Sequence, residues 1–416
     1  MTSNPNLSPT DNRSNNIPPP RLPNSQPKSG TFAFLLAIAL TLFLGLFLAD
    51  AFVSLADDSL ILLFGIHVIS ATRAALCFFA MLIAVVIYGL MGLTPMIPKR
   101  WFLPLTLYYP VTQLAILPCM IYSFGRITQA NCFFSFIQVV LGVAILYRIQ
   151  GRFKLQWLLV PADRLTGRGF SWGNFSIYVL ANIFLLLPAT FLYLFVCSAM
   201  TVDHFTDGFM TLHPDGLRVQ VRKYVRDDGK IIELFPMAHV ADAGFYGRVS
   251  RTFPTNSIIL MEGVRDSQNL LTNGISYRHM AKFLGLTEQK VTFGHGRGKM
   301  VGADIDVNQF SKNTIDCLNL VMLLHAQGLN SGSLLKLMEY SPPPHIEQDL
   351  YEDLLTKRNQ HLLKEIQSHL AETDNIMVPW GAGHMPGIAR GIQDDGFRPV
   401  ETNQFMAIHF RKRTEN

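Results

Sequence analysis

Charged residues are scarce in this chain. Only 16% of its 416 residues are Asp, Glu, Lys or Arg, whereas 49% are hydrophobic. That balance is too apolar for an ordinary soluble protein of this length. The net charge of +5 belongs largely to short loops between apolar segments, so it does not predict a nucleic-acid partner.

Cysteine is also scarce, and its placement excludes a disulfide framework. Cys77, Cys119, Cys132 and Cys197 lie in apolar segments, and only Cys317 lies in the second half of the chain. A domain formed by that half must therefore be stabilised by its hydrophobic core. No P-loop, Rossmann fingerprint or heptad repeat occurs, which removes the common sequence motifs of nucleotide binding and of coiled coils.

Composition divides the chain into three parts. Residues 1–30 are mostly Pro, Asn and Ser, which predicts a disordered tail, and they lack the apolar core and cleavage site of a signal peptide or a lipoprotein leader. Residues 31–200 are dominated by apolar stretches, and residues 201–416 have the composition of a globular domain. The sequence thus predicts a membrane half followed by a soluble half.

Four apolar segments have the roughly 20 residues that are needed to cross a bilayer. They are Thr31 to Ser54, Ala74 to Leu93, Phe102 to Tyr122 and Ser176 to Met200. The shorter segment Asn131 to Tyr147 is predicted as a fifth span. Leu60 to Ser70 is apolar but too short to span alone; if it did cross, the topology would invert.

The basic residues of the loops predict the orientation, because Lys and Arg are enriched on the cytoplasmic side. They gather before the first, third and last spans: Arg13, Arg21, Lys28, Lys99, Arg100, Arg148, Arg152, Lys154, Arg164 and Arg168. The other loops hold little more than Arg73 and Arg126. We therefore expect a multi-pass protein of the cell membrane, in contact with the lipid bilayer, with a cytoplasmic N-terminus and an extracytoplasmic C-terminal domain. Asp50, near the outer end of the first span, is expected at the membrane interface.

The second half alternates strand and helix patterns. A hairpin is predicted from Leu217 to Pro236 with its turn at Gly229, which can adopt positive φ. The elements expected after it are a helix over 240–254, a strand over 257–262, helices over 310–327 and 349–373, a strand over 375–384, a helix from 385 and a strand over 405–410. We therefore expect a mixed α/β domain with a central β-sheet flanked by helices.

Three of the predicted strands end in a polar side chain. Residues 230–239 end at His239, 375–384 end at His384, and the strand between them in sequence ends at Glu262. In open α/β sheets ligands bind at the carboxyl ends of the strands. A predicted helix follows each histidine directly, which suggests a domain built as two related halves.

Two imidazoles and a carboxylate form a suitable ligand set for a divalent first-row metal ion. Such an ion lowers the pKa of bound water and polarises a carbonyl group, so hydrolysis is the expected reaction. From the residues alone the alternative is equally open: His239 and His384 are then buried, hydrogen-bonded side chains at strand ends. The glycines before His384 allow the backbone to approach a ligand closely.

Further candidates lie between the two histidines. Asp304 is predicted to supply an additional oxygen ligand or to orient a histidine, and the alternative for Asp304 and Asp306 is ordinary placement of acids before a helix. His295, in a glycine-rich stretch, belongs to a loop that could close over a site. A surface loop without that role is the alternative.

These pieces resemble the TraB, GumN and Tiki family. The matching features are Pro236 to His239 with a GxxH-like end, the strand ending at Glu262, the Arg358-Asn359 pair in a late helix, and Gly381 to His384 followed by a helix. The resemblance covers about Leu217 to Val400 and none of the membrane half. The wider superfamily also includes ChaN-like haem-binding and erythromycin-esterase-like proteins.

The resemblance implies a metal-dependent hydrolytic centre, which in Tiki proteins is a peptidase that uses a metal of the manganese or cobalt type. His239, Glu262 and His384 would hold the ion, which we expect to be of the manganese, cobalt or zinc type. Arg358 would be an electrostatic partner of Glu262 or of the oxyanion formed when water attacks the carbonyl.

Two positions qualify the resemblance. Pro236 stands where the family has a glycine, and proline removes an N–H donor. Arg265, close after Glu262, is a second candidate for the family's arginine.

The function expected from these observations is a membrane-anchored, metal-dependent hydrolase, a peptidase, acting on a peptide or another carbonyl substrate outside the cytoplasm. The alternative is an extracytoplasmic module that binds haem or a peptide without catalysis. A transporter is disfavoured, since the spans carry few charges and no paired broken helices. The sequence does not predict the oligomeric state.

Overall fold

The computed structural model divides the chain into two compact units. One comprises residues 1–116 and 125–183, and the other residues 117–124 and 184–416. The structure describes residues 30–151, 157–272, 278–289, 297–327 and 345–410, with a few single residues between 330 and 343.

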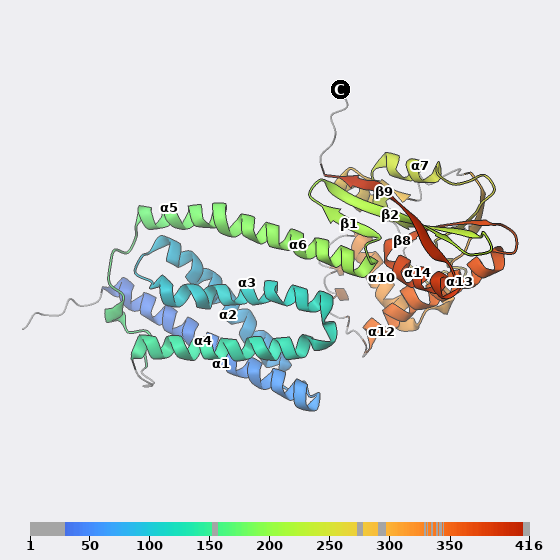
Figure 1. Ribbon diagram of the computed structural model, residues 1–416. Coiled ribbons are helices and arrows are strands. Elements are labelled where there is room, and N and C mark those ends of the chain that lie inside the picture. The colour runs from blue at the N-terminus through green and yellow to red at the C-terminus, as the bar shows by residue number, and fades with distance from the viewer. Residues whose placement is uncertain are drawn as a thin grey trace, which may run out of the picture. The chain divides into compact units, whose positions relative to one another are not determined.

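Long apolar helices make up the first unit and lead into the second (Figure 1). They are α1 (Thr31–Phe64), α2 (Ser70–Leu93), α3 (Lys99–Tyr122), α4 (Ile127–Gln150), α5 (Trp172–Ala181) and α6 (Leu187–Thr206), the last two joined by the π-helical turn Asn182–Leu186. With α5 and α6 taken together, five helical segments of the described chain are long and apolar enough to cross a membrane. The five predicted spans are thereby confirmed.

The first helix is longer than predicted. It was expected to end at Ser54, but α1 continues to Phe64 and ends at Gly65, which adopts φ 67°. The apolar run that begins at Leu60 therefore starts as the last turn of α1, and it forms no crossing segment of its own. Glycine suits this cap because left-handed backbone is free of strain without a Cβ.

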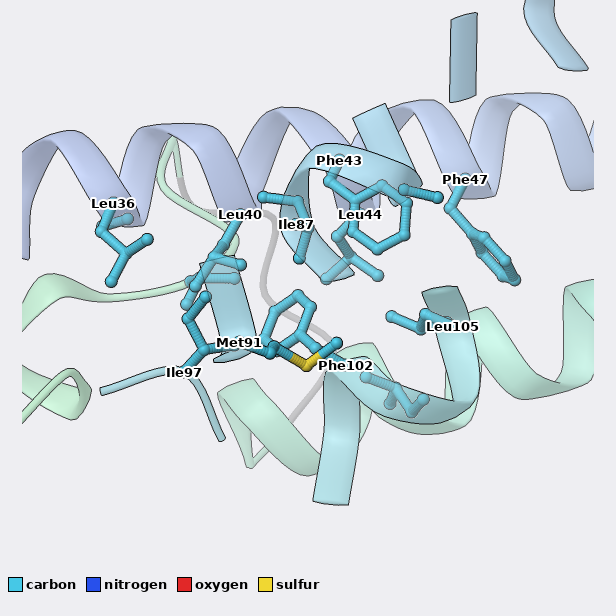
Figure 2. Packing of buried hydrophobic residues seen from close by; sticks show 14 of the residues in the cluster. Leu36, Leu40, Phe43, Leu44, Phe47, Ile87, Met91, Ile97, Phe102 and Leu105 are labelled. Atoms are coloured by element: carbon cyan, nitrogen blue, oxygen red, sulfur yellow. The ribbon is translucent and has the colours of Figure 1, made fainter. Parts of the chain in front are cut away.

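Side chains of α1, α2 and α3 form the apolar core of the first unit (Figure 2). Leu40 and Phe43 of α1 pack with Ile87 of α2 and Phe102 of α3, and all four are buried. On the α4 side, a Cβ at Gly142 would lie 2.7 Å from the Leu48 side chain. A small residue at this position allows two helices to approach closely, as is common between membrane helices.

A mixed β-sheet forms the centre of the second unit. Its order is β1-β2-β3-β8-β5-β7, and β9 also pairs with β2. The strands β3, β8, β5 and β7 are parallel, whereas β1, β2 and β9 are antiparallel. Their bounds are β1 Met210–His213, β2 Gly216–Val225, β3 Ile231–Met237, β5 Ile258–Met261, β7 Lys299–Gly302, β8 Asn375–Gly381 and β9 Arg398–His409. A separate short pair joins β4 (Val240–Ala241) to β6 (Thr287–Glu288).

Helices cover both faces of this sheet, and the strands β3, β5 and β8 at its centre are mostly apolar. One face packs against α13 (Lys357–His369) and α14 (Met385–Asp394), with Leu234, Val378 and Leu260 in that core. The other face packs against α7 (Ala243–Ser250). The described residues also form the helices α8 (Arg278–Leu284), α10 (Lys312–Gln327) and α12 (Ile346–Tyr351), and a π-helical turn, Glu352–Thr356, joins α12 to α13.

The α/β prediction is therefore confirmed, with local differences. The helix predicted from Val240 begins only at Ala243, because Val240 and Ala241 pair with β6. The last strand begins at Arg398, earlier than predicted, since it pairs with β2 along its whole length. Construction from two related halves stays a prediction: β4 separates His239 from α7, whereas α14 begins directly after His384.

Candidate functional site

Three neighbouring strands bring the predicted residues to one edge of the sheet. β8 lies between β3 and β5 and runs parallel to both, with Met237 of β3 opposite Gly381 of β8. His239 follows β3, Glu262 follows β5, and His384 ends the short 3-10 turn after β8. Because the carboxyl ends of parallel strands lie at the same edge, these side chains share the position at which α/β sheets bind ligands.

Arg358 of α13 lies at the centre of this edge. Its NH2 group donates to Glu262 Oε1 and to Asp304 Oδ2, both at 2.7 Å, and its Nε donates to Asp304 Oδ1 at 3.0 Å. Burial disfavours the charge of Arg358, but the hydrogen bonds and charges of the two carboxylates raise its pKa above the usual value. The guanidinium is therefore a permanent, well-oriented cation.

Asp304 holds Arg358 in place. Besides Arg358, its Oδ1 accepts the N–H of Ile305 and its Oδ2 accepts the N–H of Gly263, both at 2.9 Å. A carboxylate has about four acceptor positions, and all of them are used here. Asp304 was predicted to bind a metal ion or to orient a histidine; its contacts support neither role and make it the positioning group of the arginine.

His384 is buried and has a defined tautomer. Its Nδ1 lies 2.7 Å from the side-chain oxygen of Asn359, which only accepts, so Nδ1 carries the proton and Nε2 carries the lone pair. Nε2 lies 3.1 Å from Arg358 NH1 and 3.6 Å from Glu262 Oε1. Burial, assisted by the charge of Arg358, lowers the pKa of His384 to about 4. The imidazole is therefore neutral at neutral pH and can act as a base or as a metal ligand.

The position of Glu262 depends on Gly381. Its Oε2 accepts the backbone N–H of Gly381 at 2.6 Å, and a Cβ added to that glycine would lie 3.3 Å from the same oxygen. The glycine was predicted to let the backbone approach a ligand; in the structure the group that approaches is the carboxylate of Glu262. This contact leaves Oε1 directed towards Arg358 and His384.

His239 lies at the outer side of the site. It is exposed, and a charge on its ring contributes, as the smallest of several causes, to the lowered pKa of His384. The carbonyl of His239 accepts the N–H of Gln289 at 3.0 Å, which ties the residue to the β4–β6 pair.

The residues fit the predicted metal ion in part. His384 Nε2 and Glu262 Oε1 are donor atoms of a suitable kind and lie 3.6 Å apart, but each accepts a hydrogen bond from Arg358 that an ion would have to displace. His239 is a suitable donor at the same edge. Asp304 does not fit, because its oxygens are occupied. No group of three His, Cys, Asp or Glu side chains in the described part of the chain is arranged to hold a metal ion.

The other predicted residues lie elsewhere. Arg265 is exposed and donates to the carbonyl of Gly302 at 3.4 Å, so Arg358 is the arginine of this site. Asp306 accepts the N–H of Asn308 and caps a 3-10 turn, the alternative expected for it. His295 lies outside the described residues.

Trp380 is the site residue that the sequence did not indicate. Its ring is fully buried, its indole N–H donates to the carbonyl of Leu260 at 3.0 Å, and its edge packs against His384. The guanidinium of Arg358 lies 5.4 Å from its ring centre, within the range of a cation–π contact. A tryptophan directly before Gly381 in a buried strand was the available indication. Asn359 was part of the motif, but no role was predicted for it.

No family model matches the chain, and no curated protein or solved structure matches it. Function is therefore inferred from the site itself.

Proposed function

We propose that the second unit is a metal-dependent hydrolase, anchored by the membrane helices, that cleaves a peptide or another carbonyl substrate outside the cytoplasm. The observation that supports this most is the pair formed by His384 and Glu262. The Nε2 atom of His384, which accepts a hydrogen bond from Arg358, lies 3.6 Å from a carboxylate oxygen of Glu262 at the ligand-binding edge of the sheet. Neighbouring nitrogen and oxygen donors of this kind are typical of catalytic metal centres.

The ion, of the manganese, cobalt or zinc type, would be held by His384, Glu262 and His239. When bound, it supplies a water of lowered pKa and polarises the substrate carbonyl. Asn359 supports this role because its hydrogen bond to Nδ1 directs the lone pair of Nε2 into the site.

Arg358 would stabilise negative charge. Asp304 fixes the guanidinium from one side, so its NH1 group remains directed at the edge where His384 lies. A preorganised donor beside a developing oxyanion is worth several kcal/mol in hydrolases, about 3 when a single donor is removed. Trp380 would keep water away from one side of the guanidinium and so strengthen this interaction.

Metal analysis of the purified full-length protein tests the proposal. After incubation with manganese, cobalt or zinc and removal of excess ion, mass spectrometry should find one ion per chain. His384→Gln and His239→Ala should each lose that ion and lose cleavage of a peptide library. His361→Ala, on the partly exposed face of α13, should retain both.

Two results would contradict the proposal. One is stoichiometric metal retained in His384→Gln with circular dichroism like that of the wild type. The other is a stoichiometric Soret band when haem is added to the wild type, which would indicate a haem-binding module instead.

A further inference from the structure

The buried face of α1 changes character along its length. Up to Phe47 it is apolar and contributes the core seen in Figure 2. Beyond that residue it presents Asp50, Ser54, Asp57 and Asp58, each no more than 5% exposed. Their spacing of three or four residues places them on one side of the helix. One half of the bundle therefore has a polar interior and the other half an apolar one.

Asp50 is held by three neutral donors. Its Oδ2 accepts the hydroxyl of Tyr109 at 3.0 Å and the amide of Gln138 at 2.7 Å, and its Oδ1 accepts the hydroxyl of Ser54 at 3.3 Å. Only 1% of Asp50 is exposed. Within the described part of the chain it makes no ion pair. The other titratable side chains close to it are Cys77 and Tyr108.

This carboxyl group lies deep in the bundle. Tyr109 is at the middle of α3 and Gln138 is at the middle of α4, and each helix has 24 residues. A helix of that length extends about 36 Å and covers the hydrocarbon core of a bilayer. Asp50 was expected at the membrane interface, but in the structure it is buried, with partners at the middle of two helices that are long enough to span a bilayer. Ionisable residues at such depth are rare, and they mark proton or ion pathways.

Among the described residues, the cation of this polar part of the bundle is used elsewhere. Arg73 of α2 pairs with Asp57 at 3.3 Å and also with Asp58. The hydroxyl of Ser135 donates to Asp58 at 2.5 Å. One guanidinium thus balances two carboxylates, whereas no basic side chain that the structure describes pairs with Asp50.

The neighbours of Asp50 suit both of its protonation states. When it is ionised, Tyr109, Gln138 and Ser54 all donate to it. When it is protonated, either hydroxyl can rotate and accept its O–H, while the amide of Gln138 continues to donate. A fixed cation would favour the ionised state alone, and an apolar surrounding would favour the neutral state alone.

We propose that Asp50 is a proton-binding site of the helix bundle. The carboxylate takes up one proton from water to form the neutral acid and returns it in the reverse step, with no other bond made or broken. Two hydrogen-bonded pairs, Ser135 with Asp58 and Ser54 with Asp50, lie between the end of α1 and the carboxyl group, and these polar side chains would provide the route for the proton. Towards the other end, apolar packing closes the route (Figure 2). Because α1, α3 and α4 meet at this carboxyl group, proton uptake makes their packing depend on pH.

Infrared difference spectroscopy of the full-length protein in lipid nanodiscs tests this proposal. The wild type should develop the absorption band of a buried protonated carboxyl group as the pH is lowered. Asp50→Asn should lose that band, and Asp163→Asn, which changes an exposed carboxylate of the same unit, should keep it. A wild type without the band at any pH at which it stays folded would overturn the proposal, and so would a band unchanged in Asp50→Asn.

Two milder variants test the donors and the route. Tyr109→Phe removes one hydrogen bond to the ionised carboxylate, so the midpoint of the band should move to higher pH by about one unit. Ser135→Ala should slow the appearance of the band after a pH jump without moving its midpoint. An unchanged midpoint in Tyr109→Phe contradicts the assignment of Asp50, and an unchanged rate in Ser135→Ala contradicts the route.

Discussion

Both units bury carboxylates, and two of their sites, the sheet edge and the surroundings of Asp50, stabilise a carboxylate in opposite ways. At the sheet edge, Arg358 donates hydrogen bonds to Glu262 and Asp304, so two negative charges share one cation. In the bundle, the donors to Asp50 within the described part of the chain are hydroxyl and amide groups. A carboxylate beside a permanent cation stays ionised, whereas one with reversible neutral partners can exchange its proton. Arg358 and its two carboxylates thus form a site of fixed charge, which suits a reaction site, whereas Asp50 can change its charge.

Removing the guanidinium of Arg358 should leave the carboxylates at the sheet edge without a cation, as Asp50 is, and should strongly lower the stability of the second unit. In Arg358→Met two buried carboxylates lose their partner, and breaking a buried ion pair costs about 3–5 kcal/mol. Thermal unfolding of the second unit, followed by circular dichroism, should show this loss, and peptide cleavage should disappear. Arg265→Met, which changes an exposed arginine near the same sheet edge, should alter stability by less than about 0.5 kcal/mol. Equal stability of the two variants would mean that Arg358 does not balance these charges.

Lowering the pH should destabilise the sheet-edge cluster, formed by Glu262, Asp304, Arg358 and His384, because His384 becomes protonated. Its pKa is about 4 in the folded protein against an ordinary value near 6.5. The unfolded state therefore binds the proton more readily, so stability is complete above about pH 6.5 and falls as the pH drops towards 4. The loss from this group is about 3 kcal/mol.

The measurement uses chelator-treated protein, so that a bound ion does not compete with the proton. Stability is followed by denaturant titration across this pH range for the wild type and for His384→Gln. The difference between the two curves should shrink by the expected amount as the pH falls. Parallel curves would show that the imidazole is not held in the neutral form.

Asn359 tests whether the orientation of His384 matters as much as its presence. Asn359→Leu removes the acceptor that keeps the proton on Nδ1, while His384 itself remains. Loss of such a supporting hydrogen bond typically lowers metal affinity or activity by about 10–100-fold. Metal titration and kcat provide the readouts, and Lys364→Gln, an exposed change on the same helix, should leave both unchanged. A lower stability with unaltered metal affinity would assign Asn359 a structural role only.

The sequence predicted the ends of the strands better than their order. An apolar run followed by a polar residue marks a buried strand and its carboxyl end, so Glu262 and His384 were assigned correctly to strand ends. That β8 lies between β3 and β5 depends on pairing between distant segments, which no local pattern contains. For the same reason the partner of Asp304 was missed, since Arg358 lies 54 positions further along the chain.

The depth of Asp50 was mispredicted for a related reason. Asp57 and Asp58 resemble loop residues in hydropathy, so the first span was expected to end before them. In the structure they stay helical because Arg73 balances both charges. The helix is therefore longer, and its middle is closer to Asp50.

Glycine substitutions should give the smallest change in stability among these tests. Each unit has a glycine whose Cα lies close to another side chain, so that an added Cβ would contact it. A Cβ at Gly381 meets Glu262 Oε2 at 3.3 Å, and that carboxylate is held by Arg358 and cannot move aside. A Cβ at Gly142 meets the end of the Leu48 side chain at 2.7 Å, which can rotate, and the edge of the Phe47 ring at 3.3 Å, which has to shift by only a few tenths of an ångström. We expect Gly381→Ala to cost about 1 kcal/mol and Gly142→Ala to cost less.

Gly383→Ala is the matched control, since nothing lies within 4 Å of its Cβ position. Thermal unfolding of the three variants provides the comparison. If Gly381→Ala is as stable as Gly383→Ala, the carboxylate of Glu262 is free to shift. The sheet-edge cluster would then lack the rigidity that distinguishes it from the site around Asp50.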